Sequence, residues 1–201
     1  MDIQPLAIDG AWVMTPRILS DDRGSFLEWF RQDRFAQAAG HAMPLEQANC
    51  SVSAAGVVRG IHFADVPPGQ AKYVTCVSGR ILDVVVDIRV GSPTFGRWTS
   101  VILDPVQRRA VYIADGLGHG FASLAPDSTV LYLCSTGYDP QREHELDPLD
   151  PALGIDWQVG RPHLSDKDAA APTLDEARMA GLLPDFAACL DLRPTTDGRR
   201  E

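Results

Sequence analysis

The sequence predicts an all-β fold: a jelly-roll, double-sheet barrel with short helices near both ends of the chain. Three observations support it. Eight short apolar stretches have the length of strands, turn residues separate them, and the 15 prolines and 17 glycines are spread along the 201 residues. Hydrophobic residues make up 45% of the chain, which is enough to bury a substantial core. We therefore expect one domain over residues 1–201, with a ligand site in the cavity between two sheets.

The strand signals follow one another through the middle of the chain. The strongest is Ile81–Ile88, in which Val84 and Val86 alternate with Asp83 and Asp87. In chain order, the expected strands are Leu45–Val52, Val57–Phe63, Ala71–Val77, Ile81–Ile88, Trp98–Leu103, Arg109–Ala114, Gly118–Leu124 and Ser128–Ser135.

Turn and helix signals complete the chain. Asp104-Pro105 predicts a hairpin between the two strands that flank it. Helices are expected at Gln32–Ala39 and at Asp175–Gly181, the second with Thr173 as its N-cap. Proline and aspartate are dense from about residue 137, and we expect this tail to wrap the core rather than to form a second domain.

The charge and the cysteines limit the classes of partner. Lys and Arg number 18 and Asp and Glu 27, so the net charge is −9. This disfavours nucleic acid and anionic membrane surfaces, and no apolar run approaches the length of a membrane helix. An anionic ligand would need a local basic cluster. The four cysteines form no C-x-x-C pair and the N-terminus shows no signal peptide, which indicates a reducing, cytoplasmic location.

His62 and Arg59 share one expected strand. On spacing alone, a packed histidine explains His62 better than a functional one does. Strict alternation would place the two side chains on opposite faces. Gly60 lies between them, and a bulge there could turn both inward.

His119 lies in a second glycine-rich strand, Gly118–Leu124. The stretch is not a dinucleotide fingerprint, because Phe121 stands where glycine is needed and no helix is expected after it. No metal is expected either, since a mononuclear site normally needs three or more protein ligands in reach. Tyr132 and Tyr138 are either rim aromatics or, for one of them, a general acid.

Seven motifs, taken together, resemble one family. They are Asp22-Arg23-Gly24-x-Phe26, Gln47-x-Asn49-x-Ser51, Arg59-Gly60-Ile61-His62-Phe63, Pro68-Gly69-Gln70-Ala71-Lys72, Asp87-Ile88-Arg89-x-Gly91-Ser92-Pro93-Thr94-Phe95-Gly96, His119-Gly120-Phe121 and Leu164-Ser165-x-Lys167-Asp168. In this order, from about residue 10 to 185, they resemble the dTDP-4-dehydrorhamnose 3,5-epimerases. The resemblance implies a cofactor-free, homodimeric jelly roll of the cupin group that acts on dTDP-4-keto-6-deoxyglucose or a close analogue.

The same resemblance implies a role for each matched residue. His62 would be the catalytic base, Asp168 its partner, Tyr132 the proton donor and Lys72 the group over the keto oxygen. Tyr138 would stack near the thymidine ring. The matched substrate-binding positions are Arg23, Phe26, Glu28, Gln47, Asn49, Arg59, His119, Glu143 and Lys167. Four of the cations, Arg23, Arg59, Lys72 and Lys167, are expected to line one cavity.

Three alternative functions and one departure from the family pattern stay open. The family includes relatives that epimerise carbon 3 alone, and a non-catalytic sugar-nucleotide-binding cupin would keep Arg59 and Lys72 without needing His62 or Asp168. A metal-dependent cupin enzyme is a further, less favoured reading. Gly118 and Ala122 depart from the family pattern, in which many relatives have alanine and a larger apolar residue. The pathway implied is dTDP-L-rhamnose or antibiotic deoxysugar biosynthesis.

Overall fold

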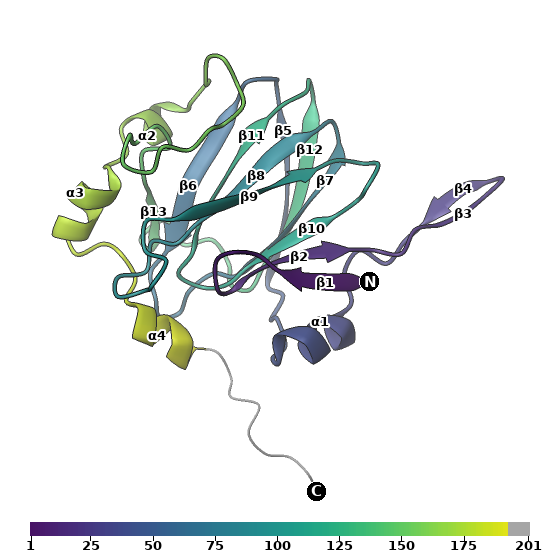
Figure 1. Cartoon of the computed structure of the whole chain (residues 1–201), viewed down its shortest axis with the longest axis horizontal. Coiled ribbons are helices and arrows are strands. Elements are labelled where there is room, and N and C mark those ends of the chain that lie inside the picture. The colour runs from purple at the N-terminus through teal and green to yellow at the C-terminus, as the bar shows by residue number, and fades with distance from the viewer. Residues whose placement is uncertain (193–201) are drawn as a thin grey trace, which may run out of the picture.

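The computed structural model describes residues 1–192, in which two antiparallel sheets pack face to face (Figure 1). The strands are β1 (Asp2–Pro5), β2 (Ala11–Thr15), β3 (Leu19–Asp21), β4 (Gly24–Phe26), β5 (Gln47–Ser53), β6 (Val58–Ala64), β7 (Lys72–Ser78), β8 (Ile81–Val86), β9 (Trp98–Leu103), β10 (Ala110–Ile113), β11 (Gly118–Ser123), β12 (Ser128–Cys134) and β13 (Glu143–Glu145). One sheet has the order β1-β2-β10-β7-β12-β5 and the other β13-β6-β11-β8-β9, while β3 and β4 pair only with each other.

The predicted all-β fold is confirmed, and each of the eight expected strands is present within a few residues of its expected bounds. The hairpin predicted at Asp104-Pro105 is wrong. Strand β9 pairs with β8 in the five-stranded sheet, whereas β10 pairs with β2 and β7 in the other. The Asp104 carboxylate accepts the backbone N–H groups of Val106 and Gln107, so the turn is real, but it carries the chain from one sheet to the other.

Four short helices lie outside the sheets: α1 (Gln32–Ala39), α2 (Asp166–Ala169), α3 (Leu174–Met179) and α4 (Phe186–Asp191). The expected helix at residues 32–39 is confirmed, and Gly40 ends it with a φ of 79° that favours glycine. Thr173 caps α3 as predicted, through a reciprocal capping box with Glu176. No helix in residues 1–192 is both long and apolar enough to cross a membrane.

The five-stranded sheet is buried on both faces. On β8, Val85 joins the cluster that fills the space between the sheets, whereas Val84 joins a second cluster on the outer face. The chain after β13 covers that outer face with Leu146, Trp157 and Leu174. The interior face is therefore the one on which polar side chains can meet a ligand.

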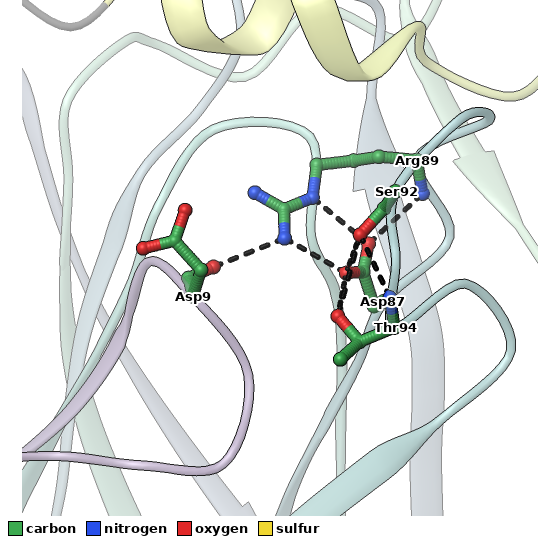
Figure 2. A network of polar contacts seen from close by, with 5 residues as sticks. All are labelled: Asp9, Asp87, Arg89, Ser92 and Thr94. Carbon is green, nitrogen blue, oxygen red and sulfur yellow. Dashed lines mark hydrogen bonds and ion pairs between the residues drawn. The ribbon is translucent and has the colours of Figure 1, made fainter.

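The loop after β8 contains a buried polar network (Figure 2). Asp87 accepts hydrogen bonds from Arg89 Nε and Nη2, both at 2.8 Å, and from the hydroxyls of Ser92 and Thr94. Arg89 Nη2 also donates to the backbone carbonyl of Asp9. The network ties the N-terminal segment to the five-stranded sheet, which explains the Asp87-to-Gly96 motif as structural.

Candidate active site

Strand β6 contains a bulge at Gly60. His62 pairs with His119 and Arg59 with Phe121, so Gly60 and Ile61 together oppose Gly120. The predicted bulge is thus confirmed, and it turns Arg59 and His62 to the same, interior face. A Cβ at Gly60 would lie 2.5 Å from the backbone oxygen of His119, and its φ is 109°, so only glycine fits.

His62 and Asp168, which are 106 residues apart in the sequence, form a hydrogen-bonded pair. The distance from His62 Nε2 to Asp168 Oδ1 is 2.8 Å. The Asp168 side chain is 5% exposed and that of His62 is 39% exposed, so the imidazole can reach a ligand while the carboxylate cannot. Ser165 donates its hydroxyl to Asp168 Oδ2 and accepts the Asp168 backbone N–H as the N-cap of α2.

These contacts decide which nitrogen of His62 is available. Burial alone would raise the pKa of Asp168, but the hydrogen bond and charge of His62, the Ser165 hydroxyl and Lys167 together hold that pKa below its usual value. Asp168 is therefore an ionised carboxylate that can only accept, and His62 Nε2 carries the hydrogen. Nδ1 remains free to take a proton from a ligand.

Lys72 and Tyr132 lie on the six-stranded sheet, across the interior from β6. Cys134 pairs with Lys72, and Tyr132 with Asn49. Burial lowers the pKa of Lys72, against the charge of Glu143, which raises it. Burial also raises the pKa of Tyr132, so its phenol keeps its proton in the ordinary pH range.

Polar contacts link the two sheets around this interior. Arg59, on β6, donates from Nε to the Ser53 hydroxyl on β5 at 3.0 Å. Gln70 donates to Glu143 on β13 at 2.9 Å. The sheets therefore hold the predicted residues on opposite walls of one space.

The loop after β12 contacts β5 and lines a cavity. The Tyr138 backbone N–H donates to the Gln47 side chain at 2.8 Å, and Gln47 in turn donates to Asn49 at 2.8 Å. Tyr138 and Glu143 line a cavity of about 340 Å³. The Tyr138 ring is exposed there, and an aromatic ligand group can stack on it.

Three predicted binding residues lie elsewhere. Arg23 and Phe26 are exposed on the β3–β4 hairpin, which projects from the opposite side of the molecule to β6 and α2 (Figure 1). Glu28 follows the hairpin and pairs with Arg31. The expectation that Arg23 lines one cavity with the other cations is wrong for the single chain. Within residues 1–192 the hairpin pairs with no other strand, and Arg23 forms an ion pair with Asp21 of the same hairpin.

Lys167 precedes Asp168 in α2. Its side chain is exposed and forms an ion pair with Glu145. Glu145 is the cross-strand partner of His62 and was not among the predicted site residues. Asp83 was not among them either, and its Oδ2 lies 2.8 Å from His119 Nε2. The signal for Asp83 was its place in the strongest predicted strand, where a carboxylate stands among apolar residues.

The departures at Gly118 and Ala122 point away from the site. A Cβ on Gly118 would lie 2.6 Å from Ile61 Cγ2, and Ala122 belongs to the outer cluster. Both positions therefore face the side of the sheet that the tail covers, so they do not contact a ligand between the sheets.

In residues 1–192, no group of three or more His, Cys, Asp or Glu side chains is placed to hold a metal ion. The absence of a metal stays a prediction.

Comparisons with known proteins identify relatives of this chain. Residues 5–176 match the family model described as dTDP-4-dehydrorhamnose 3,5-epimerase. The chain is 58% identical to a dTDP-4-dehydrorhamnose 3-epimerase of Streptomyces niveus over 94% of this chain and 91% of the relative. It is also 58% identical to a dTDP-4-dehydrorhamnose 3,5-epimerase of Mycolicibacterium smegmatis, over 94% of each.

Solved structures are similarly close. An epimerase of Mycobacterium tuberculosis superposes with a TM-score of 0.94 at 53% identity, covering 96% of this chain and 98% of the other. A 3'-monoepimerase from Streptomyces bikiniensis in complex with dTDP-quinovose gives a TM-score of 0.92 at 53% identity, covering 94% and 96%.

Proposed function

The chain belongs to the dTDP-4-dehydrorhamnose 3,5-epimerase family of isomerases, and we propose that it inverts carbons 3 and 5 of a dTDP-4-keto-6-deoxy sugar. The observation that carries the proposal is the His62–Asp168 pair on one wall of the interior, with Lys72 and Tyr132 on the other. A base and an acid on opposite walls can act on opposite faces of a sugar ring.

The first step is removal of a hydrogen next to the ketone. The C–H bond at carbon 3 breaks, its proton goes to His62 Nδ1, and its electron pair becomes the enolate that ends on the carbon-4 oxygen. Asp168 stabilises the resulting imidazolium and keeps the ring oriented. Lys72 faces the developing negative charge as a buried ammonium, where electrostatic stabilisation is strong. Because the enolate carries the charge, this chemistry calls for no cofactor.

The second step returns a proton to the opposite face. The Tyr132 hydroxyl donates to carbon 3, which restores the ketone with inverted configuration. The phenolate then recovers a proton from solvent, and the His62 imidazolium releases its proton to solvent. The same two steps at carbon 5 give the second inversion. The raised pKa of Tyr132 supports this role, because the phenol stays protonated until the enolate forms.

We propose a homodimer to explain the hairpin. Arg23 and Phe26 match substrate-binding positions, yet β3–β4 projects away from the site of its own chain (Figure 1). In a symmetric dimer, this hairpin of one protomer would reach the site of the other. A mixture of Arg23→Ala and His62→Ala chains tests this, because a mixed dimer would then regain one intact site. Absence of any regained activity in confirmed mixed dimers contradicts the shared site.

The carbon-3-only epimerase is the second candidate. Relatives with each of the two activities in their names are equally similar, at 58% identity, so overall similarity does not separate them. A deoxysugar pathway and a cytoplasmic location complete the proposal. Cys50, Cys76 and Cys134 form no disulfide within residues 1–192, as suits a reducing compartment.

The test is incubation with dTDP-4-keto-6-deoxyglucose in deuterated water, with the label located by NMR after reduction of the product. The proposal predicts deuterium at carbons 3 and 5. Label at carbon 3 alone selects the monoepimerase, and no label at either carbon would identify a binding protein without catalysis.

A further inference from the structure

A second histidine–carboxylate pair lies beside the first. His119 and His62 are cross-strand partners on β11 and β6, and both face the interior between the sheets. Directly paired side chains in antiparallel strands have Cβ atoms about 4.5–5.5 Å apart. A sugar ring that contacts His62 therefore also lies within reach of His119.

Asp83 holds the other side of the His119 ring. His119 Nε2 and Asp83 Oδ2 are 2.8 Å apart, and the Asp83 side chain is fully buried. A carboxylate can only accept, so the hydrogen of His119 is on Nε2 in both the neutral and the charged form of the ring. This leaves Nδ1 of His119 for a ligand.

The surroundings of Asp83 are apolar. Its cross-strand partners are Phe121 on β11 and Val101 on β9, and its neighbours on the same face of β8 are Ile81 and Val85. Its second oxygen, Oδ1, is buried and has no hydrogen-bond partner among residues 1–192.

Such a carboxylate is a poor stabilising element. An unsatisfied buried polar atom costs free energy, and replacing a buried polar pair by apolar residues of similar volume is often neutral or stabilising. Asp168 differs, because the Ser165 hydroxyl satisfies its second oxygen. The advantage of a carboxylate at position 83 must therefore come from its hydrogen bond to His119.

We propose that Asp83 is a positioning residue for the epimerisation: it fixes the ring and the Nε2 hydrogen of His119 beside the sugar end of the bound nucleotide sugar. The inference rests on the proposed function, since it concerns the same site. The inference assigns Asp83 to the sugar rather than to the nucleotide. His119 is the cross-strand partner of His62, the proposed catalytic base, whereas the exposed Tyr138 lies elsewhere in the site.

The first experiment replaces Asp83 with leucine, and with asparagine as the conservative variant. Asp83→Leu keeps the volume and suits the apolar neighbours, so the free energy of unfolding should stay the same or rise. Its kcat should fall roughly 10- to 100-fold, the scale of a misplaced contact group. Asp83→Asn retains a carbonyl acceptor for the Nε2 hydrogen and should recover part of this loss. A merely structural Asp83 gives the reverse: lower stability and unchanged kcat per folded molecule.

A double-mutant cycle and NMR complete the test. The double variant Asp83→Leu with His119→Ala should be no slower than His119→Ala alone, because Asp83 acts only through His119. Additive losses would overturn the proposal. Nitrogen-15 NMR should show His119 protonated at Nε2 in the native protein and a mixture of tautomers in Asp83→Leu. An unchanged spectrum contradicts the positioning role even if the native protein turns out not to epimerise, so the two proposals can fail separately.

Discussion

Asp87 and Asp168 are both buried carboxylates with a nitrogen partner at 2.8 Å, and yet their surroundings give them different capacities. Asp87 faces the guanidinium of Arg89, and both side chains are completely buried. Asp168 faces a histidine that is partly open to the interior, and imidazole is the side chain best suited to accept and return a proton. The first pair can only hold the structure together, whereas the second can accept a proton and return it.

The hydrogen bonds around each carboxylate show the same difference. Asp87 is surrounded by Arg89, Ser92 and Thr94 within one loop (Figure 2). Burial opposes the ionisation of Asp87, but these donors hold its pKa below the usual value. Asp168 receives its bonds from two separate elements, β6 and the cap of α2, so its position depends on how the tail packs against the sheet.

The largest expected effect on turnover comes from Asp168→Asn. The amide keeps a carbonyl acceptor but can also donate, so it holds the hydrogen on His62 Nε2 less strictly, and it lacks the charge that stabilises the imidazolium. We therefore expect kcat to fall about 10²- to 10⁴-fold while the fold is kept. Asp166→Asn, two residues earlier in α2 and exposed, is the matched control and should keep its activity. Native turnover in a folded Asp168→Asn protein would contradict the role of the pair.

Asp87→Ala should act on stability instead. Removing one partner leaves the Arg89 charge buried, which costs about 3–5 kcal/mol of the free energy of unfolding. Denaturant titration measures this loss, and kcat per folded molecule should match that of the native protein. A large fall in kcat without loss of stability would show that the two regions are not separate in function.

The smallest expected effect is a shift in the alkaline limb of the pH profile. Lys72 is active as an ammonium, and burial lowers its pKa from the ordinary 10.5, so activity should fall as pH rises through a value below 10.5. Burial raises the pKa of Tyr132 from its ordinary value of 10.0, so a limb below pH 10 does not come from Tyr132. Lys72→Arg should move the limb to higher pH, since arginine stays charged.

A second variant sharpens the pH test. The Glu143 charge raises the Lys72 pKa against the effect of burial, so Glu143→Gln should move the same limb to lower pH. An alkaline limb that stays in place in both variants would assign it to a group other than Lys72.

The strands, the bulge at Gly60 and the α1 helix could be predicted because their signals are local. Alternation reports which residues share a face, and glycine between Arg59 and His62 marks the irregularity. The path of the chain between sheets could not be predicted, since Asp104-Pro105 forms the same local turn whether β10 returns beside β9 or crosses to the other sheet.

The site was predicted in part, for the same physical reason. His62 and Asp168 are in contact, and Lys72 and Tyr132 lie on the facing sheet. Arg23 and Phe26 lie elsewhere, because residue type does not reveal that their hairpin projects (Figure 1). Asp83 and Glu145 were missed because each depends on a cross-strand neighbour, which spacing along the chain does not show.

The central claim is that His62 removes the hydrogen beside the ketone. Its most direct test compares the rates at which solvent deuterium enters carbon 3 of dTDP-4-keto-6-deoxyglucose with the native protein and with His62→Ala. Denaturant titration must first show that the free energy of unfolding of the variant matches that of the native protein. The account predicts rapid incorporation with the native protein and incorporation at the uncatalysed rate with the variant. Native-rate incorporation by folded His62→Ala protein would contradict it.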